Sequence, residues 1–348
     1  MPDTKRFLGK IAAILGMVFL LWPALLVRAQ DPTGVPLSPE QMNLLSQIDA
    51  ADADQRSWQS YTTLSFNSQF YSETLVVSFG DERVNQETTN STITTLFDGN
   101  PLTGGYSSDV LLTLERREQQ YLSAEEQRVE NYTLLAELVY RDNRLYVQAL
   151  RNGGSENLPP MPELGWYDLT DNLDRFPALD PIRLRRYLPE APLPATPNPI
   201  LDTDFFVLTR GTNLRSLVAD IVLVNDNEVL TEGPNAGTTV RQIRIQLNPL
   251  AMLRQAFAGF EGSEELVASF ANENVDMSLT VWLDASTSRR VREQFVFVLQ
   301  GEPDPTLFGY APGEFTTEGG LRVLYQLERD ISYIDINAPV EIPVPDIQ

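Results

Sequence analysis

Apolar and polar residues alternate with a period of two along much of the chain from Tyr61 onward. This pattern is typical of strands that bury one face. Residues 141–144 (RDNR) have the composition of a tight turn, so the runs on either side of them are predicted to form a hairpin. We therefore predict an antiparallel meander in the first half, with strands at residues 61–70, 74–79, 92–97, 110–117, 132–140 and 145–150.

Helical patterns are fewer. Ser38-Pro39 is typical of an N-cap followed by proline at the first helical position, which predicts a helix that runs to about Trp58. Its apolar side is predicted to hold Met42, Leu44, Leu45, Ile48 and Ala51. Further helices are predicted at residues 180–187, at 213–219, after Asn248-Pro249 and after Ser263, and further strands at 205–209, 221–224 and 240–247. With a final strand pair over Gly320–Ile336, these elements predict an α+β fold in which antiparallel strands dominate.

Residues 278–301 (SLTVWLDASTSRRVREQFVFVLQG) predict a second hairpin around a polar turn. The first strand places Leu279 and Val281 on one face, whereas the returning strand is apolar on both faces. A strand that is apolar on both sides needs a cover on each face. That cover is either a set of helices or a ligand in the concavity of a curved sheet, or else a two-sided core.

The N-terminus predicts export. Residues 1–29 combine a basic start, an apolar run and small residues before a cut after Ala29, which is typical of a signal peptide, with an uncleaved membrane anchor as the alternative. Residues 30–37 form a leader, 38–340 one domain and 341–348 a C-terminal tail. Within the domain, the proline-rich segment 189–199 is extended and either drapes over the sheet as a loop or links two domains. The predicted location is periplasmic or extracellular.

Charge excludes nucleic acid as a partner. The chain has 26 Lys and Arg against 48 Asp and Glu, a net charge of −22, and its only lysines are Lys5 and Lys10. Nucleic acids and anionic membranes both require clustered basic residues, so membrane contact is peripheral or transient at most. The chain has no cysteine, which excludes disulfides and a lipobox anchor.

Composition also removes most catalytic chemistry. Without His and Cys there is no imidazole base, no thiol nucleophile and no usual zinc site. A carboxylate hydrolase would need two acids facing each other in a cleft, and no Asp or Glu lies in a recognisable signature. Oxygen ligands alternate at Asp168, Thr170, Asn172 and Asp174, and Asp226-Asn227-Glu228 is acidic, but neither stretch has the glycine and glutamate of a calcium loop. We predict no enzyme activity, cofactor or metal.

The order of the elements resembles a known family. An exported leader and amphipathic helix precede a hairpin at 134–150, a GWYDL stretch at 165–169 and a strand RQIRIQL that runs into NPLAMLRQAF. The hairpin VWLDASTSRRVREQFVF and a terminal strand that reaches INAP follow. In residues 38–340 this resembles the periplasmic lipoprotein-carrier superfamily of LolA, and most closely its LppX/LprG lipoprotein branch. The chain departs from that branch in lacking a lipobox cysteine, in its greater length and in the 189–199 insertion.

The resemblance implies a fold and a function. The fold is a curved, half-open antiparallel β-barrel with helices covering its concave side, and the function is to carry a lipid or lipoprotein whose acyl chains lie in an apolar cavity. An envelope protein would be a further partner. The alternative is a non-enzymatic envelope binding or sensor module with a filled core. The residues predicted to line the cavity, each of which is otherwise plain core, are Leu64, Phe66, Phe70, Ile243, Ile245, Val281, Phe295 and Phe297.

Overall fold

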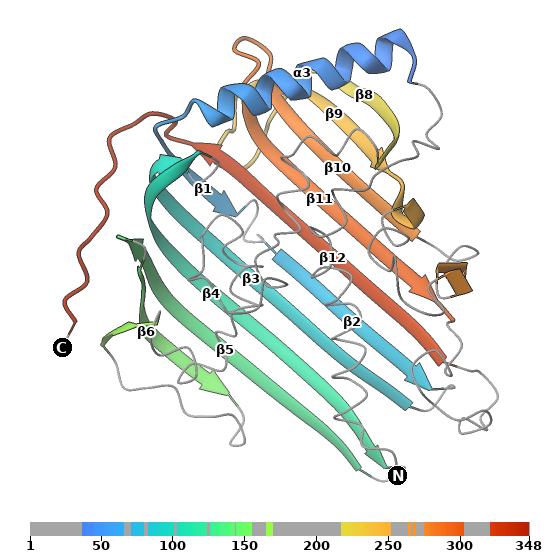
Figure 1. Cartoon of the computed structure of the whole chain (residues 1–348). Helices are drawn as coiled ribbons and strands as arrows, with labels where there is room; N and C mark the ends of the chain where they lie inside the picture. Colours follow the sequence, from blue (N-terminus) through green and yellow to red (C-terminus); the bar gives the residue numbers. More distant parts are fainter. Residues whose placement is uncertain are drawn as a thin grey trace.

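A computed structural model describes one long helix and an antiparallel sheet (Figure 1). The described residues are 37–65, 71–79, 83–100, 103–123, 126–142, 144–154, 165–169, 217–251, 264–265, 267–268, 275–302 and 321–347. The strands are β1 (Ser60–Ser65), β2 (Tyr71–Phe79), β3 (Arg83–Asn100), β4 (Gly104–Ser123), β5 (Glu126–Arg141), β6 (Arg144–Gly154), β7 (Trp166–Asp168), β8 (Val218–Val229), β9 (Thr239–Leu247), β10 (Val275–Asp284), β11 (Arg290–Gly301) and β12 (Leu321–Ile334).

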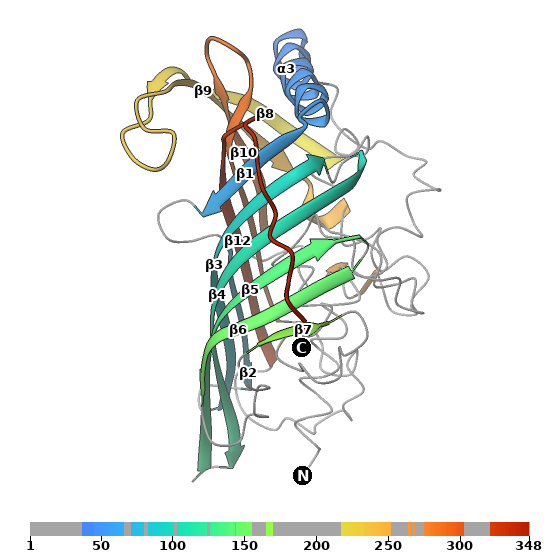
Figure 2. The same cartoon turned by 90° about the vertical axis from the view of Figure 1, so that its left-hand side faces the viewer.

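Two meanders meet in the middle of this sheet. The strand order is β7-β6-β5-β4-β3-β1-β12-β11-β10-β9-β8, and β2 also pairs with β3 and β12. Strands β1 and β2 therefore share one position in the sheet, end to end, between β3 and β12. Thr62 pairs with Ile334, so the first and last described strands are neighbours. Seen along its edge, the sheet is a curved wall with the helix beside one end (Figure 2).

The helix α3 (Pro39–Arg56) begins where the sequence predicts it to begin. The Ser38 hydroxyl accepts from the backbone N–H of Gln41, and the Gln41 side chain accepts from the backbone N–H of Ser38, which completes a capping box. The predicted residues Leu44, Leu45, Ile48 and Ala51 are buried, but Met42 is 49% exposed. At 100° per residue Met42 lies on the flank of the helix, away from the side that faces the sheet.

The predicted α+β class, with helices covering the concave side, is wrong. The described chain is mostly strand, and α3 contacts β8 and β11 at one end of the sheet. Part of the predicted helix 213–219 is strand, because β8 starts at Val218. The predicted strand pair over Gly320–Ile336 is the single strand β12, which is long because it pairs with β1, β2 and β11.

The other strand predictions within the described residues are confirmed. The 141–144 turn joins β5 to β6, and the 278–301 hairpin is β10 and β11. Asn248 caps a helical turn by accepting from the backbone N–H of Ala251. Residues 1–36, which include the predicted signal peptide, lie outside the described residues, as do the helix at 180–187, the strand at 205–209 and the 189–199 segment. Within the described ranges, none of the helices is long and apolar enough to span a bilayer.

One face of the sheet carries the core, and we call it the apolar face. Pairing aligns apolar side chains across the strands, as in the row Ile93–Leu112–Ala136–Ala149 from β3 to β6. On the same face the buried side of α3 joins this cluster, and Tyr61 stacks on Phe97 with ring centroids 4.6 Å apart. The opposite side, which we call the polar face, has a smaller cluster of Leu230, Val240, Trp282 and Val291.

A buried ionic network fixes α3 to the apolar face. Arg290 of β11 is 0% exposed and donates to Glu293 at 2.7 Å and to Asp52 of α3. Arg329 of β12 lies 3.9 Å from the other oxygen of Glu293 and is also buried. Two arginines and two carboxylates therefore balance each other between the helix and the sheet. Removing one member leaves an uncompensated charge in a site of low polarity.

We predict that Arg290→Ala lowers the free energy of unfolding by about 3–5 kcal/mol, because Glu293 and Asp52 lose their shared cation in a buried site. Arg322→Ala is the control, since Arg322 and its partner Glu302 are both more than half exposed and such pairs contribute about 0–1 kcal/mol. Urea unfolding followed by circular dichroism measures both. Equal losses for the two variants would contradict a stabilising role for the network.

Candidate functional site

The residues predicted to line a cavity are mostly brought together. Ile243, Ile245, Val281, Phe295 and Phe297 lie on the apolar face of β9, β10 and β11, in one cluster, and each is 0–2% exposed. Cross-strand pairs connect them, since Val281 pairs with Ile243 and Leu279 pairs with both Ile245 and Phe295. These side chains are tightly enclosed by protein atoms, and their contact with a ligand stays a prediction.

Leu64 is separated from that cluster. It is half-buried on β1, where alternation places Thr63 and Tyr61 on the apolar face and Leu64 on the polar face. Its partners Thr94 and Ser332 are on the polar face too. The sequence alternation did not reveal which side of this short strand faces the core. The two phenylalanines predicted beside it, Phe66 and Phe70, lie outside the described residues.

Along β3, β4 and β5 the side chains on the apolar face change from aliphatic to polar and charged. Leu114 and Leu134 end the apolar rows, and the next row is Thr89–Arg116–Tyr132. Beyond it lies a row of three glutamates, Glu87, Glu118 and Glu130. Arg116 is held by ion pairs with Glu87 at 3.0 Å and Glu118 at 2.9 Å. We call the row Thr89–Arg116–Tyr132, together with Ser91, the polar border.

Two hydroxyls at the polar border are buried without a hydrogen-bond partner in the described structure. They are Ser91 Oγ and the Tyr132 hydroxyl, whose residues are 4% and 8% exposed. Burial raises the pKa of Tyr132 to about 12, so the group stays a neutral hydroxyl. A buried polar atom without a partner costs about 1–3 kcal/mol, which makes these two atoms available to a ligand.

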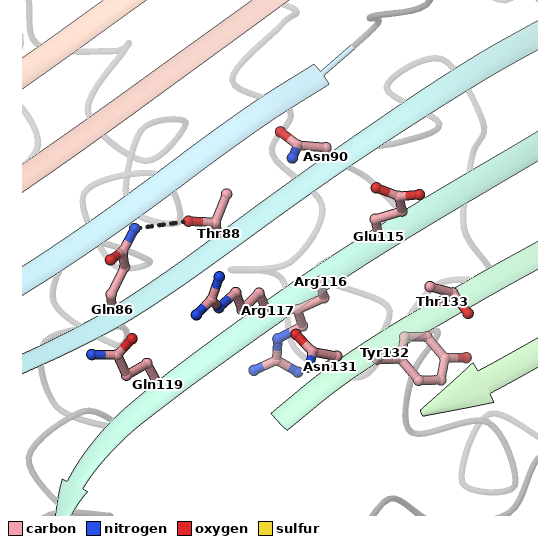
Figure 3. Close-up of a pocket in the computed structure, with 10 residues that line it drawn as sticks. All are labelled: Gln86, Thr88, Asn90, Glu115, Arg116, Arg117, Gln119, Asn131, Tyr132 and Thr133. Atoms are coloured by element: carbon pink, nitrogen blue, oxygen red, sulfur yellow. Dashed lines mark hydrogen bonds between the residues drawn. The ribbon is translucent and has the colours of Figure 1, made fainter. Parts of the chain in front are cut away.

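A pocket opens on the polar face of the same three strands (Figure 3). Its volume is about 540 Å³, within the range of small-molecule sites. Pairing places Thr88, Arg117 and Asn131 in one row and Asn90, Glu115 and Thr133 in the next. The described lining residues are Gln86, Thr88, Asn90, Glu115, Arg116, Arg117, Gln119, Asn131, Tyr132 and Thr133. Sequence alternation indicates that these polar side chains lie on the outward face of their strands. Which of them lie next to each other depends on the strand register, which the sequence does not give.

Two of the carboxylates considered as calcium ligands form ion pairs with arginines. Asp168 forms an ion pair with Arg144, and Asp226 forms one with Arg241 at 2.5 Å. Thr170, Asn172 and Asp174 lie outside the described residues. Asp168 and Asp226 therefore join neighbouring strands, β6 to β7 and β8 to β9.

Comparisons with known proteins leave the family open. No family model and no curated protein matches the sequence. Among solved structures, the chain is similar to a β-barrel-like protein of a domain of unknown function, DUF1849, from Brucella abortus. The identity is 8% and the TM-score 0.19, over 80% of this chain and 99% of the other. A likeness at this level carries no argument, so the resemblance to the carrier superfamily stays a prediction.

The carboxyl group of Asp109 on β4 has a clearly shifted pKa. Burial, and secondarily the charge of Glu137, raise the pKa of Asp109 from 3.8 to about 6, although a backbone hydrogen bond from Val110 opposes the shift. A raised pKa means that the folded state favours the protonated carboxyl. This contribution to stability is therefore complete below pH 3.8 and is lost as the pH rises through about 6.

We predict that Asp109→Asn stabilises the protein at pH 7 by about 1 kcal/mol, a value reduced for solvent screening of a half-exposed carboxyl. The amide keeps an acceptor for Val110 and cannot ionise. At pH 3.5 the two proteins should have nearly equal free energies of unfolding. Asp142→Asn is the control, because the Asp142 side chain is 88% exposed. A constant difference between Asp109→Asn and wild type from pH 3.5 to 7 would contradict the assignment.

Proposed function

We propose that the protein is an exported, non-catalytic carrier that binds an amphiphile with an acyl chain, such as a lipid or a lipidated protein. The observation that carries this proposal is the polar border on the apolar face of β3, β4 and β5. There, rows of aliphatic side chains end at two buried hydroxyls and a paired arginine. An amphiphile has the matching order along its length, an apolar acyl chain followed by a polar headgroup.

The aliphatic rows supply the affinity for the acyl chain. Ile93 pairs with Leu112 in one row and Leu114 pairs with Leu134 in the next, with no charged side chain on this face between them and the polar border. Burial of each CH₂ group contributes about 0.8 kcal/mol. A chain that covers several such positions therefore binds without a charged contact, which suits a protein whose net charge is −22.

The polar border supplies orientation. Tyr132 and Ser91 can donate to ester or amide oxygens of a headgroup, and so regain the hydrogen bonds that burial denies them. Arg116 adds a cation, although its two glutamate partners leave that row without net positive charge. A neutral or zwitterionic headgroup fits this border better than an anion.

Binding requires the protein to open. Leu112 is 0% exposed and Leu134 is 1% exposed, so protein atoms already occupy the contact surface of these side chains. A ligand must displace those atoms, and we infer that uptake is much slower than diffusional encounter. A carrier of this kind also needs a donor or acceptor in the envelope, and that partner would be expected to lower the barrier.

We predict that Tyr132→Phe raises the free energy of unfolding of the ligand-free protein by about 1 kcal/mol, because it removes a buried hydroxyl without a partner. The same change should weaken binding of a fluorescent phospholipid several-fold, since the headgroup loses a donor. Tyr146→Phe on β6 is the control, because alternation places Tyr146 on the other face. Titration of delipidated protein measures the affinity, and urea unfolding measures the stability.

Native mass spectrometry of the purified protein tests the proposal itself. An amphiphile that co-purifies and exchanges with added phospholipid supports the carrier. If nothing co-purifies and neither fatty acid nor phospholipid is taken up, the carrier is excluded, and a binding or sensor module with a filled core is the better account. Equal effects of Tyr132→Phe and Tyr146→Phe on affinity would remove the polar border from the site.

A further inference from the structure

The pocket on the polar face has side chains with unused hydrogen-bonding groups. Glu115, Arg117, Gln119 and Asn131 have no hydrogen bond or ion pair with protein in the described structure. Other described arginines of the sheet, such as Arg116 and Arg292, pair with acids. The other amides of the pocket have protein partners: Asn90 accepts from Ser72, and Gln86 donates to Thr88 at 3.3 Å.

The strand register concentrates these groups. Glu115, Arg117 and Gln119 are alternate residues of β4, so their side chains leave the same face at intervals of about 7 Å. Asn131 pairs directly with Arg117 from β5, and Thr88 pairs with it from β3. In Figure 3 the side chain of Arg117 lies among those of Thr88, Gln86 and Gln119, and Asn131 lies on the neighbouring strand.

The charge of the pocket favours a neutral ligand. Glu115 and Arg117 balance each other, and Arg116 is already paired with Glu87 and Glu118. The chain as a whole has a net charge of −22, which repels anions at long range. Most of the described lining residues have amide, guanidinium, carboxylate or hydroxyl groups, which suit a ligand that forms several hydrogen bonds.

We propose that this pocket binds a neutral oligosaccharide through Glu115, Arg117, Gln119 and Asn131. Sugar hydroxyls both donate and accept, and the planar carboxylate, guanidinium and amide groups present matching pairs of acceptors or donors to neighbouring hydroxyls. Four partnerless planar groups of these types are the complement of a polyhydroxylated ligand. These four side chains lie on the opposite face of the strands from the proposed lipid site, although Arg116 and Tyr132 of the polar border also belong to the described lining of the pocket.

Calorimetry and saturation-transfer NMR with soluble linear oligosaccharides of glucose, mannose, galactose and N-acetylglucosamine test this. At least one series should bind, with an affinity that stays within twofold between 50 and 300 mM NaCl because the ligand is uncharged. Arg117→Ala and Asn131→Ala should each weaken binding at least tenfold. Arg117→Lys should fail to restore it, since an ammonium lacks the planar pair of donors.

Arg151→Ala is the matched control, because Arg151 is exposed on neighbouring β6, carries the same charge and does not belong to the described lining. It should change the affinity less than twofold. The proposal is overturned if no neutral saccharide binds or if Arg117→Ala leaves binding unchanged. Salt-sensitive binding of an acidic sugar or of a dipeptide in place of neutral saccharides would overturn it as well.

Discussion

The antiparallel pairing of β12 with both β1 and β2 is the constraint on which the sheet depends. Without it the described strands would form two separate sheets, β1 to β7 and β8 to β12, each with an unpaired inner edge. This pairing joins residues 272 positions apart, since Thr62 pairs with Ile334. Such long-range contacts form late in folding, and exposed inner edges are prone to pair with other chains until they do.

Closure also aligns the faces of the two meanders. Because side chains alternate strictly, the register at β12 decides whether the apolar rows of β3–β6 continue into those of β9–β11. They do continue, through Tyr333, Ile331 and Leu327 of β12. The ionic network of Arg290 lies on this shared face, where one helix end meets the sheet. Charges that the apolar face admits are thus paired, and they tie separate elements together.

The sequence alternation predicted most strands, the α3 cap and the β10–β11 hairpin, because each depends on local patterns. The sequence predicted too much helix, because a short stretch such as 213–219 fits the helical period as well as the strand period. In the structure Val218 begins strand β8, which pairs with β9. The apolar side of β9–β11 was predicted correctly as a common face, whereas Leu64 of short β1 was not. The pocket could not be predicted, because Asn90, Arg117 and Asn131 meet only once register is fixed.

Both proposed sites lie at the same level of β3, β4 and β5, on opposite faces. Arg116 and Arg117 are consecutive residues, yet one is paired with glutamates beside the aliphatic rows and the other has no protein partner in the pocket behind them. Asn131 and Tyr132 on β5 are also consecutive residues whose side chains lie on opposite faces. This follows from the alternation of a strand, which gives neighbouring residues opposite surroundings. A one-residue shift of β4 against β3 would exchange the two sets of side chains and abolish both sites, so the register that builds the core also determines the binding chemistry of each face.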